Sequence, residues 1–132
     1  MFAGSGETKA EIGKCAAFID DFEAYAGGDI VILRPDNMIS LFLGYYLNTM
    51  PINRQKASKG QGDAVVHIGA TALGNIDIVI PSLSEQTEIA AVLSDMDEEI
   101  NALEDRLEKA RQIKQGMMQE LLTGRIRLPI ST

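Results

Sequence analysis

The chain has 132 residues, of which 45% are hydrophobic and 23% charged, and its formal net charge is −7 from 12 basic and 19 acidic side chains. This length allows one domain with an extension and a modest core. Acidic side chains exceed basic ones in residues 1–83 and again in residues 84–132. Neither part therefore has the positive field that is typical of a protein that binds nucleic acid by itself.

Features that the sequence lacks exclude several classes of protein. Cys15 is the only cysteine, which excludes an internal disulfide framework. No basic flank followed by an apolar run marks a signal peptide, and no run approaches the roughly twenty apolar residues that cross a membrane, so we expect the cytoplasm. No phosphate-binding loop, nucleophile elbow, paired metal motif or adenine methyltransferase motif is found, so we expect a non-catalytic protein without cofactor or metal.

The first elements along the chain are two strands and a helix. Residues 12–19 predict a strand with an irregular edge. Residues 29–33 follow Gly27-Gly28, which is typical of a turn, and their continuous apolar run predicts a strand buried on both faces. Apolar side chains in residues 40–48 predict a buried helix with Ser40 as its N-cap.

Three short elements follow. Residues 51–59 predict a second helix, because Pro51 fits a first helical turn. Residues 70–73 predict one helical turn, and alternating isoleucines in residues 75–80 predict a strand. Together with the preceding elements they predict a small mixed α/β domain over residues 1–81.

A local cluster of basic side chains is the candidate DNA contact. Arg54, Lys56 and Lys59 stand close together, and no acidic residue follows them until Asp63. Lysine and arginine neutralise phosphates, and the nearby Gln61 can pair with adenine. Gln55 and the glycines around Gln61 supply further amide groups. The alternative is a solvated helix end and loop.

The single histidine and the tyrosines have weaker signals. His67 lacks the spacing of a metal ligand and has no identifiable nucleophile partner. A structural hydrogen bond that holds the loop is the favoured role of His67, and a DNA contact is the alternative. Tyr25, Tyr45 and Tyr46 can stack on bases, although tyrosines beside leucines at helical spacing are more typical of a core.

Residues 82–124 predict one long helix with a marked start and end. Ser82 and Glu85 fit a capping box directly after Pro81. Gly124 supplies the left-handed residue that closes helices, and Pro129 prevents continuation. The adjacent cap-forming residues Ser94 and Asp95 indicate a break.

Apolar residues along this helix recur in alternating steps of four and three, which is the spacing of a left-handed coiled coil. We call them the seam: Ile89, Leu93, Met96, Ile100, Leu103, Leu107, Ala110, Met117 and Leu121. Lys114 interrupts the seam, and a polar residue at such a position tends to fix the register. The alternative is a surface helix that packs on its own domain.

Short motifs along the helix match a known family pattern. The matching residues are Glu85-Gln86, Ile89-Ala90, Leu93, Asp97, Ile100 and Leu103, followed by Lys114-Gln115-Gly116-Met117-Met118-Gln119-Glu120-Leu121-Leu122-Thr123-Gly124-Arg125-Ile126. This pattern resembles the conserved helical region of type I restriction–modification specificity (S) subunits. Residues 27–35 and 42–81 are similar to the second half of a target-recognition domain in that family.

The resemblance implies a role and partners. A full specificity subunit has two target-recognition domains that read the two halves of a bipartite DNA sequence. Each domain is followed by a long conserved helix, and the two helices pack antiparallel and dock modification (methyltransferase) subunits. The specificity subunit itself catalyses nothing. The implied partners are double-stranded DNA, a type I modification subunit, a restriction subunit indirectly, and a second copy of the chain through the helix.

The resemblance also implies an α+β chain with three parts. Residues 1–81 are expected to be a partial target-recognition domain, residues 82–124 a coiled-coil spacer and dimerisation helix, and residues 125–132 a tail. A complete recognition domain in the family is nearly twice as long as the part ahead of this helix. We therefore expect a truncated gene or a missing half that is encoded elsewhere.

Three hypotheses stay open. The chain is a half-sized specificity subunit that recognises DNA and pairs through antiparallel helices. Alternatively, it is an interaction module that dimerises or binds the modification subunit without reading DNA. A small enzyme is the third hypothesis, and no constellation of residues supports it.

Overall fold

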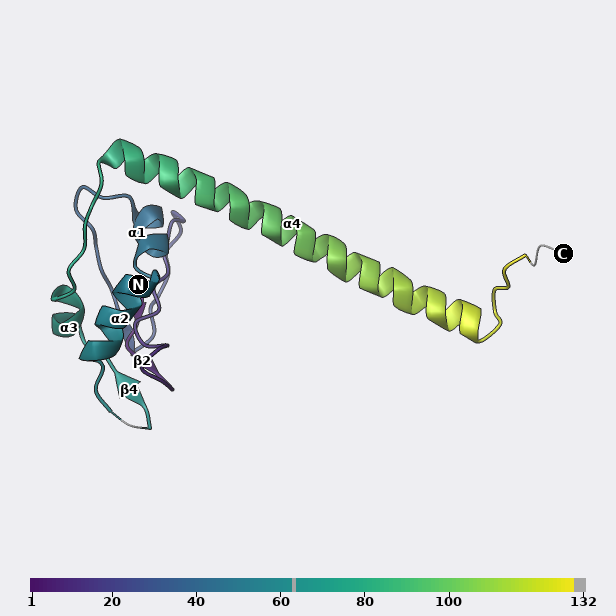
Figure 1. The fold of residues 1–132 in the computed structure, drawn as a ribbon, viewed down its shortest axis with the longest axis horizontal. Coiled ribbons are helices and arrows are strands. Elements are labelled where there is room, and N and C mark those ends of the chain that lie inside the picture. The colour runs from purple at the N-terminus through teal and green to yellow at the C-terminus, as the bar shows by residue number, and fades with distance from the viewer. Residues whose placement is uncertain (63, 130–132) are drawn as a thin grey trace. The chain divides into compact units, whose positions relative to one another are not determined.

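The computed structural model describes residues 1–62 and 64–129. The chain divides into two compact units, Met1–Leu93 and Ser94–Thr132. Of the elements in these described residues, the first unit holds the strands and three short helices, and the last helix begins in the first unit and ends in the second (Figure 1). The predicted small mixed domain followed by a long helix is confirmed.

In the described part of the chain, four very short strands form two separate antiparallel pairs. β1 (Phe2–Ala3) pairs with β3 (Ile30–Val31), and β2 (Ser5–Gly6) pairs with β4 (Val66–His67). The prediction for residues 29–33 is thus confirmed only at its centre. Ile32 and Leu33 are about half exposed, at 47% and 46%, so burial on both faces is wrong.

The strand predicted for residues 12–19 is wrong. Its start forms a turn, and residues 13–16 then hydrogen-bond to the backbone of Met1 and Ala3 and form only an isolated bridge between Phe2 and Cys15. Gly13 has a φ of 66°, in the left-handed region that only glycine adopts without strain. A Cβ at Gly13 would lie 2.8 Å from Cδ of Lys56. The turn therefore leaves room for the Lys56 side chain, which an extended strand would not do.

The strand predicted for residues 75–80 is also wrong, because side chains take the hydrogen bonds that a neighbouring strand would make. The Gln55 side chain donates to the carbonyl oxygen of Asp77 and accepts from its backbone N–H, both at 2.9 Å. The hydroxyl of Tyr46 accepts the N–H of Val79 at 3.2 Å. The segment is therefore extended backbone that is hydrogen-bonded to side chains of two helices.

The three short helices are confirmed. They are α1 (Ser40–Tyr46), α2 (Met50–Lys59), with a proline in its first turn, and α3 (Ala70–Gly74). Ser40 does not cap α1, because Ile39 occupies the N-cap position and Ser40 is already the first helical residue.

The core of the first unit has two clusters of buried side chains. The larger consists of Phe2, Phe42, Leu43, Leu47, Ile52 and Ala90, and the smaller of Ile12, Val66 and Ile68. The Tyr46 ring stacks on Phe42 with centroids 5.4 Å apart, and it packs against the larger cluster. The core role predicted for Tyr46 is therefore confirmed.

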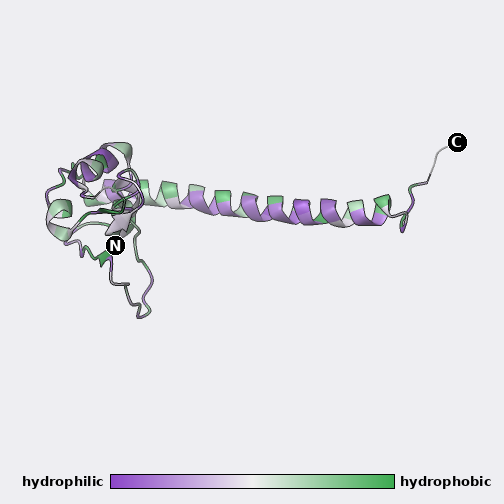
Figure 2. Ribbon diagram, turned by 90° about the horizontal axis from the view of Figure 1, so that it is seen from below, coloured by the Kyte–Doolittle hydropathy of each residue, from purple (hydrophilic) through white to green (hydrophobic). Residues whose placement is uncertain are grey.

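α4 (Leu83–Leu122) is the long helix, and at 40 residues it is about 60 Å long. Ser82 Oγ accepts the N–H of Glu85 at 3.3 Å, and Gly124 has a φ of 72°, so both predicted end signals are confirmed. The helix runs through Ser94-Asp95 without the predicted break. Figure 2 shows apolar and polar residues alternating along it. Within the described residues, no helix is long and apolar enough to cross a membrane.

Lys56 is buried in the first unit and ties three segments together. Its side chain has no exposed surface, and Nζ donates to the carbonyl oxygens of Gly13 at 2.6 Å and Leu47 at 2.8 Å. Burial lowers the pKa of Lys56, because the ammonium loses water, and nearby Cys15 acts in the opposite direction. The two carbonyl groups offset part of the cost of burying the charge.

We predict that Lys56→Met lowers the free energy of unfolding by about 1–3 kcal/mol, because two buried carbonyl groups lose their donor. Because the pKa of Lys56 is lower in the folded state, the unfolded state binds more protons at pH values between that lowered pKa and the ordinary lysine pKa. The stability advantage of the wild type over Lys56→Met should therefore grow as the pH rises through that window. Urea unfolding followed by tyrosine fluorescence measures both effects.

Lys59→Met is the matched control, because Lys59 lies on the same helix and is partly exposed. Its free energy of unfolding should change by no more than about 0.5 kcal/mol. Equal losses in the two variants would contradict the structural role of Lys56.

Candidate functional site

Two basic side chains of the candidate DNA surface are accessible. Arg54 is exposed on α2, and Lys59, the last residue of α2, is partly exposed. They are five positions apart on the helix, so they point in different directions around its axis. Phosphate contacts from both would therefore come from separate points along a DNA backbone.

After α2, the described residues 60–62 and 64–67 lie close together. The backbone groups of Gln61 and His67 exchange two hydrogen bonds, at 2.9 and 2.7 Å, and His67 also pairs with Ser5 in the adjacent strand. The side chains of Gln61 and His67 are exposed. The fold thus brings two of the predicted contacts together beside Lys59. We call this segment the Lys59–His67 loop.

The hydrogen bonds predicted for His67 come from its backbone. That pairing holds the loop whatever side chain stands at the position, so the imidazole itself is left exposed on the surface. A DNA contact by the imidazole stays a prediction, as do the contacts of Arg54, Lys59 and Gln61.

Lys56 does not belong to this surface, and its predicted role as a phosphate contact is wrong. A side chain with 0% exposure, whose ammonium is bound to two carbonyl groups, is not available to an external anion. Gln55 is similarly occupied, because its amide clamps the backbone of Asp77. The candidate surface is therefore smaller and less basic than the sequence pattern indicates.

Gln86 is a structural residue that sequence reasoning missed. It is 1% exposed, its Nε2 donates to the carbonyl oxygen of Pro81 at 2.9 Å, and its Oε1 accepts the N–H of Ile39 at 2.9 Å. The buried Ala90 lies four residues later on the same face of α4. This i, i+4 pair of a glutamine and an alanine was the available signal for the docked face.

The seam differs in exposure between the two units. Ile89 and Leu93, in the first unit, are half-buried. The seam residues of the second unit are mostly about half exposed: Met96 54%, Ile100 50%, Leu103 52%, Leu107 50% and Met117 46%. Ala110 is also exposed, and Leu121 is half-buried. An apolar stripe of this kind is suited to a partner helix. Its role as an interface stays a prediction.

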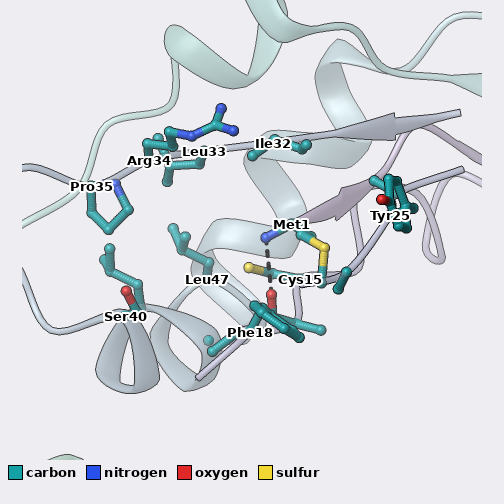
Figure 3. A pocket seen from close by; sticks show the side chains of 16 residues that line it. Met1, Cys15, Phe18, Tyr25, Ile32, Leu33, Arg34, Pro35, Ser40 and Leu47 are labelled. Carbon is teal, nitrogen blue, oxygen red and sulfur yellow. Dashed lines mark hydrogen bonds between the residues drawn. The ribbon is translucent and has the colours of Figure 1, made fainter. Parts of the chain in front are cut away.

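An apolar hollow of about 420 Å³ lies beside the N-terminus (Figure 3). The N-terminal ammonium of Met1 donates to the carbonyl oxygen of Ala16 at 2.9 Å. Burial raises the pKa of Cys15, while the N-terminal charge and Lys56 act in the opposite direction. A thiol held in its neutral form is a poor nucleophile. Tyr25, at 88% exposure, lies on this rim, with its hydroxyl donating to Glu23.

Within residues 1–62 and 64–129, no three His, Cys, Asp or Glu side chains gather in a way that could hold a metal ion. The first unit therefore presents surfaces for contact and packing. Burial keeps its one thiol in the neutral and less reactive form.

We predict that Gln86→Ala lowers the free energy of unfolding of the first unit by about 2 kcal/mol, because a partly buried N–H and a partly buried carbonyl lose their partners. All three tyrosines lie in that unit and the chain has no tryptophan, so tyrosine fluorescence during urea unfolding reports on it. Gln115→Ala, at an exposed position of α4, should change stability by about 0.5 kcal/mol at most. Similar values for both would show that the buried amide is dispensable.

Comparison with known proteins gives a consistent result. Residues 5–115 match the family described as type I restriction modification DNA specificity domain. The type I restriction enzyme MjaVIII specificity subunit of Methanocaldococcus jannaschii is 35% identical over 86 residues, which is 65% of this chain and 20% of that protein. The putative MjaX specificity subunit of the same organism is 30% identical over 88% of this chain and 28% of its own length.

The EcoKI specificity subunit of Escherichia coli is 28% identical over 127 residues, covering 96% of this chain and 27% of that protein. The chain thus spans between a fifth and three-tenths of the length of these curated relatives. No solved structure is significantly similar. The match covers residues 5–115, which include β2, β3, β4, the short helices and most of α4, so the chain belongs to the family of type I restriction–modification DNA specificity domains.

Proposed function

We propose that this chain is a DNA-recognition component of a type I restriction–modification assembly. It contacts double-stranded DNA through Arg54 and the Lys59–His67 loop, and it docks a modification subunit through α4. Specificity subunits are the non-catalytic components of type I enzymes. The observation that carries the proposal is the family match, which spans residues 5–115 and so includes the candidate surface and the seam as far as Ala110.

The chemistry of the surface fits a contact that positions DNA. Arg54 and Lys59 supply cations for phosphates, and Gln61 supplies an amide that can accept from and donate to a base edge. With a net charge of −7, the chain has to bind DNA through local contacts. Weak binding alone and stronger binding within the assembly are expected, and an assembly that reads DNA is expected in the cytoplasm. A restriction subunit joins it indirectly, through the modification subunit.

The charges on and after α4 support a homodimer with antiparallel helices. The first half, residues 85–105, has only acidic charges: Glu85, Glu88, Asp95, Asp97, Glu98, Glu99, Glu104 and Asp105. The second half, residues 106–127, is mostly basic: Arg106, Lys109, Arg111, Lys114, Arg125 and Arg127, with Glu108 and Glu120. Parallel pairing sets eight carboxylates against eight carboxylates. Antiparallel pairing places the acidic half of one helix beside the basic half of the other, and opposite charges that lie close together attract each other.

The second candidate function is an interaction module that dimerises or binds the modification subunit without reading DNA. The burial of Lys56 favours it, because one of the three predicted phosphate contacts is removed. The two functions share α4 and differ only in what the Lys59–His67 loop and Arg54 do.

We predict that the double variant Arg54→Gln, Lys59→Gln weakens binding to double-stranded DNA at least tenfold. The slope of log affinity against log salt concentration should fall by about 2, since about 0.9 counterion is released per phosphate contact. Titration of a fluorescent duplex measures both, with the chain alone and mixed with a type I modification subunit from the same genome. Lys9→Gln, Lys14→Gln removes the same charge at exposed positions and is the control. Equal affinities of the two double variants would favour the interaction module.

We predict that Leu103→Glu or Leu107→Glu dissociates the homodimer while the first unit stays folded, because each places a carboxylate in the apolar seam. Light scattering gives the mass, and tyrosine fluorescence reports the fold of the first unit. Asn101→Glu adds the same charge off the seam and should leave the mass unchanged. A dimer that survives both leucine variants would show that the seam is wrongly assigned.

A further inference from the structure

A shallow apolar groove of about 470 Å³ lies in the first unit. It is lined by Phe42, Tyr45, Tyr46, Thr49, Val79, Pro81, Ile89 and Leu93. Two of its hydroxyl groups are engaged, because the Thr49 hydroxyl donates to the carbonyl oxygen of Tyr46 at 2.8 Å and the Tyr46 hydroxyl accepts the N–H of Val79. The lining therefore favours aliphatic or thioether side chains over a polar ligand.

The groove is continuous with the seam. Ile89 and Leu93 are its first two residues, and both line the groove. Gln86 and Ala90 are buried on the adjacent face of the same turns, so the helix is fixed with Ile89 and Leu93 toward the groove. A helix that packs on Ile89 and Leu93 would therefore contact the groove.

The spacing of the seam allows antiparallel registers that differ by a heptad, and only one of them pairs every seam position. The seam positions, with Lys114 included, are mirror-symmetric about Asp105. The facing pairs are Leu103 with Leu107, Ile100 with Ala110, Met96 with Lys114, Leu93 with Met117, and Ile89 with Leu121. Every pair joins an a position to a d position, which is how the layers of an antiparallel coiled coil are built.

The one polar residue of the seam supports the same register independently. Lys114 of one copy faces the segment around Met96 of the other, and that segment carries carboxylates at Asp95, Glu98 and Glu99. A buried or half-buried ammonium needs an opposite charge nearby. Shifting the register by a heptad in either direction takes Lys114 away from the centre of this acidic segment.

We propose that the groove of one copy receives the last turns of α4 from a second copy. Met117 of the second copy packs on Leu93, and Leu121 of the second copy packs on Ile89 between the rings of α1 and the segment before α4. This inference rests on the homodimer proposed above and deepens it by naming the segment that fills the groove. The dimer interface then includes the recognition unit as well as the helix.

Disulfide cross-linking in a Cys15→Ala background tests the register directly. The double variant Leu93→Cys, Met117→Cys should form a disulfide-linked dimer under mild oxidation, seen as a doubled mass on a non-reducing gel. Leu93→Cys alone should stay unlinked, because in the proposed register it faces Met117 of the other copy. Efficient linking of Leu93→Cys alone would show parallel helices, and linking of Leu93→Cys, Ala110→Cys but not of the proposed pair would show a register shifted by one heptad. Either result overturns the inference.

Leu121→Asp tests the groove without engineered cysteines. It should raise the dissociation constant of the dimer at least tenfold, which is about 1.4 kcal/mol, because a carboxylate enters an apolar groove. Leu122→Asp is the matched control, since Leu122 is 79% exposed and off the seam. Sedimentation of both variants gives the dissociation constants. Equal values, or a wild-type chain that is monomeric throughout, overturn the inference.

The samples for cross-linking and sedimentation contain neither DNA nor a modification subunit. Loss of DNA binding in the Arg54 and Lys59 variant with intact cross-linking would therefore count against DNA recognition alone. Failure of cross-linking with DNA binding preserved would count against the groove alone.

Discussion

The side-chain amide of Gln86 fixes the orientation of the start of α4 in the first unit, and the groove depends on that orientation. It joins the first turn of α4 to the carbonyl oxygen of Pro81 and to the N–H of Ile39 at the start of α1. Both contacts are partly buried, so the amide satisfies groups that would otherwise have little access to another partner. With Gln86 and Ala90 turned inward, the rotation of α4 about its axis is set, and Ile89 and Leu93 line the groove.

The helices of this fold could be predicted from the sequence because their signals are local. Ser82 and Gly124 marked the ends of α4 within a residue or two, and the proline in the first turn marked α2. The family likewise followed from short contiguous motifs in the helix. The docked face of α4 was missed because a glutamine at a helix start is usually solvated, and only the tertiary contacts of Gln86 show its role.

The strands and half of the candidate site depended on contacts between distant residues. The strands are two residues long, which is too short for an alternating pattern, and each is defined by its partner. Residues 75–80 alternate like a strand, yet the side chains of Gln55 and Tyr46 take their backbone hydrogen bonds. Lys56 has the composition of a surface contact, and its burial depends on carbonyl groups that the turn at Gly13 and the end of α1 bring to it.

The mirror symmetry of the seam has an evolutionary consequence. In a dimer of identical chains, each substitution occurs twice, so a change at Leu103 alters two layers of the interface at once. A harmful substitution therefore weakens the interface at two places, and a favourable substitution strengthens it at two places. A duplicated gene is freed from this coupling, because each copy can then compensate the other. Two such copies could drift into an obligate pair of unlike chains, each able to acquire its own loop.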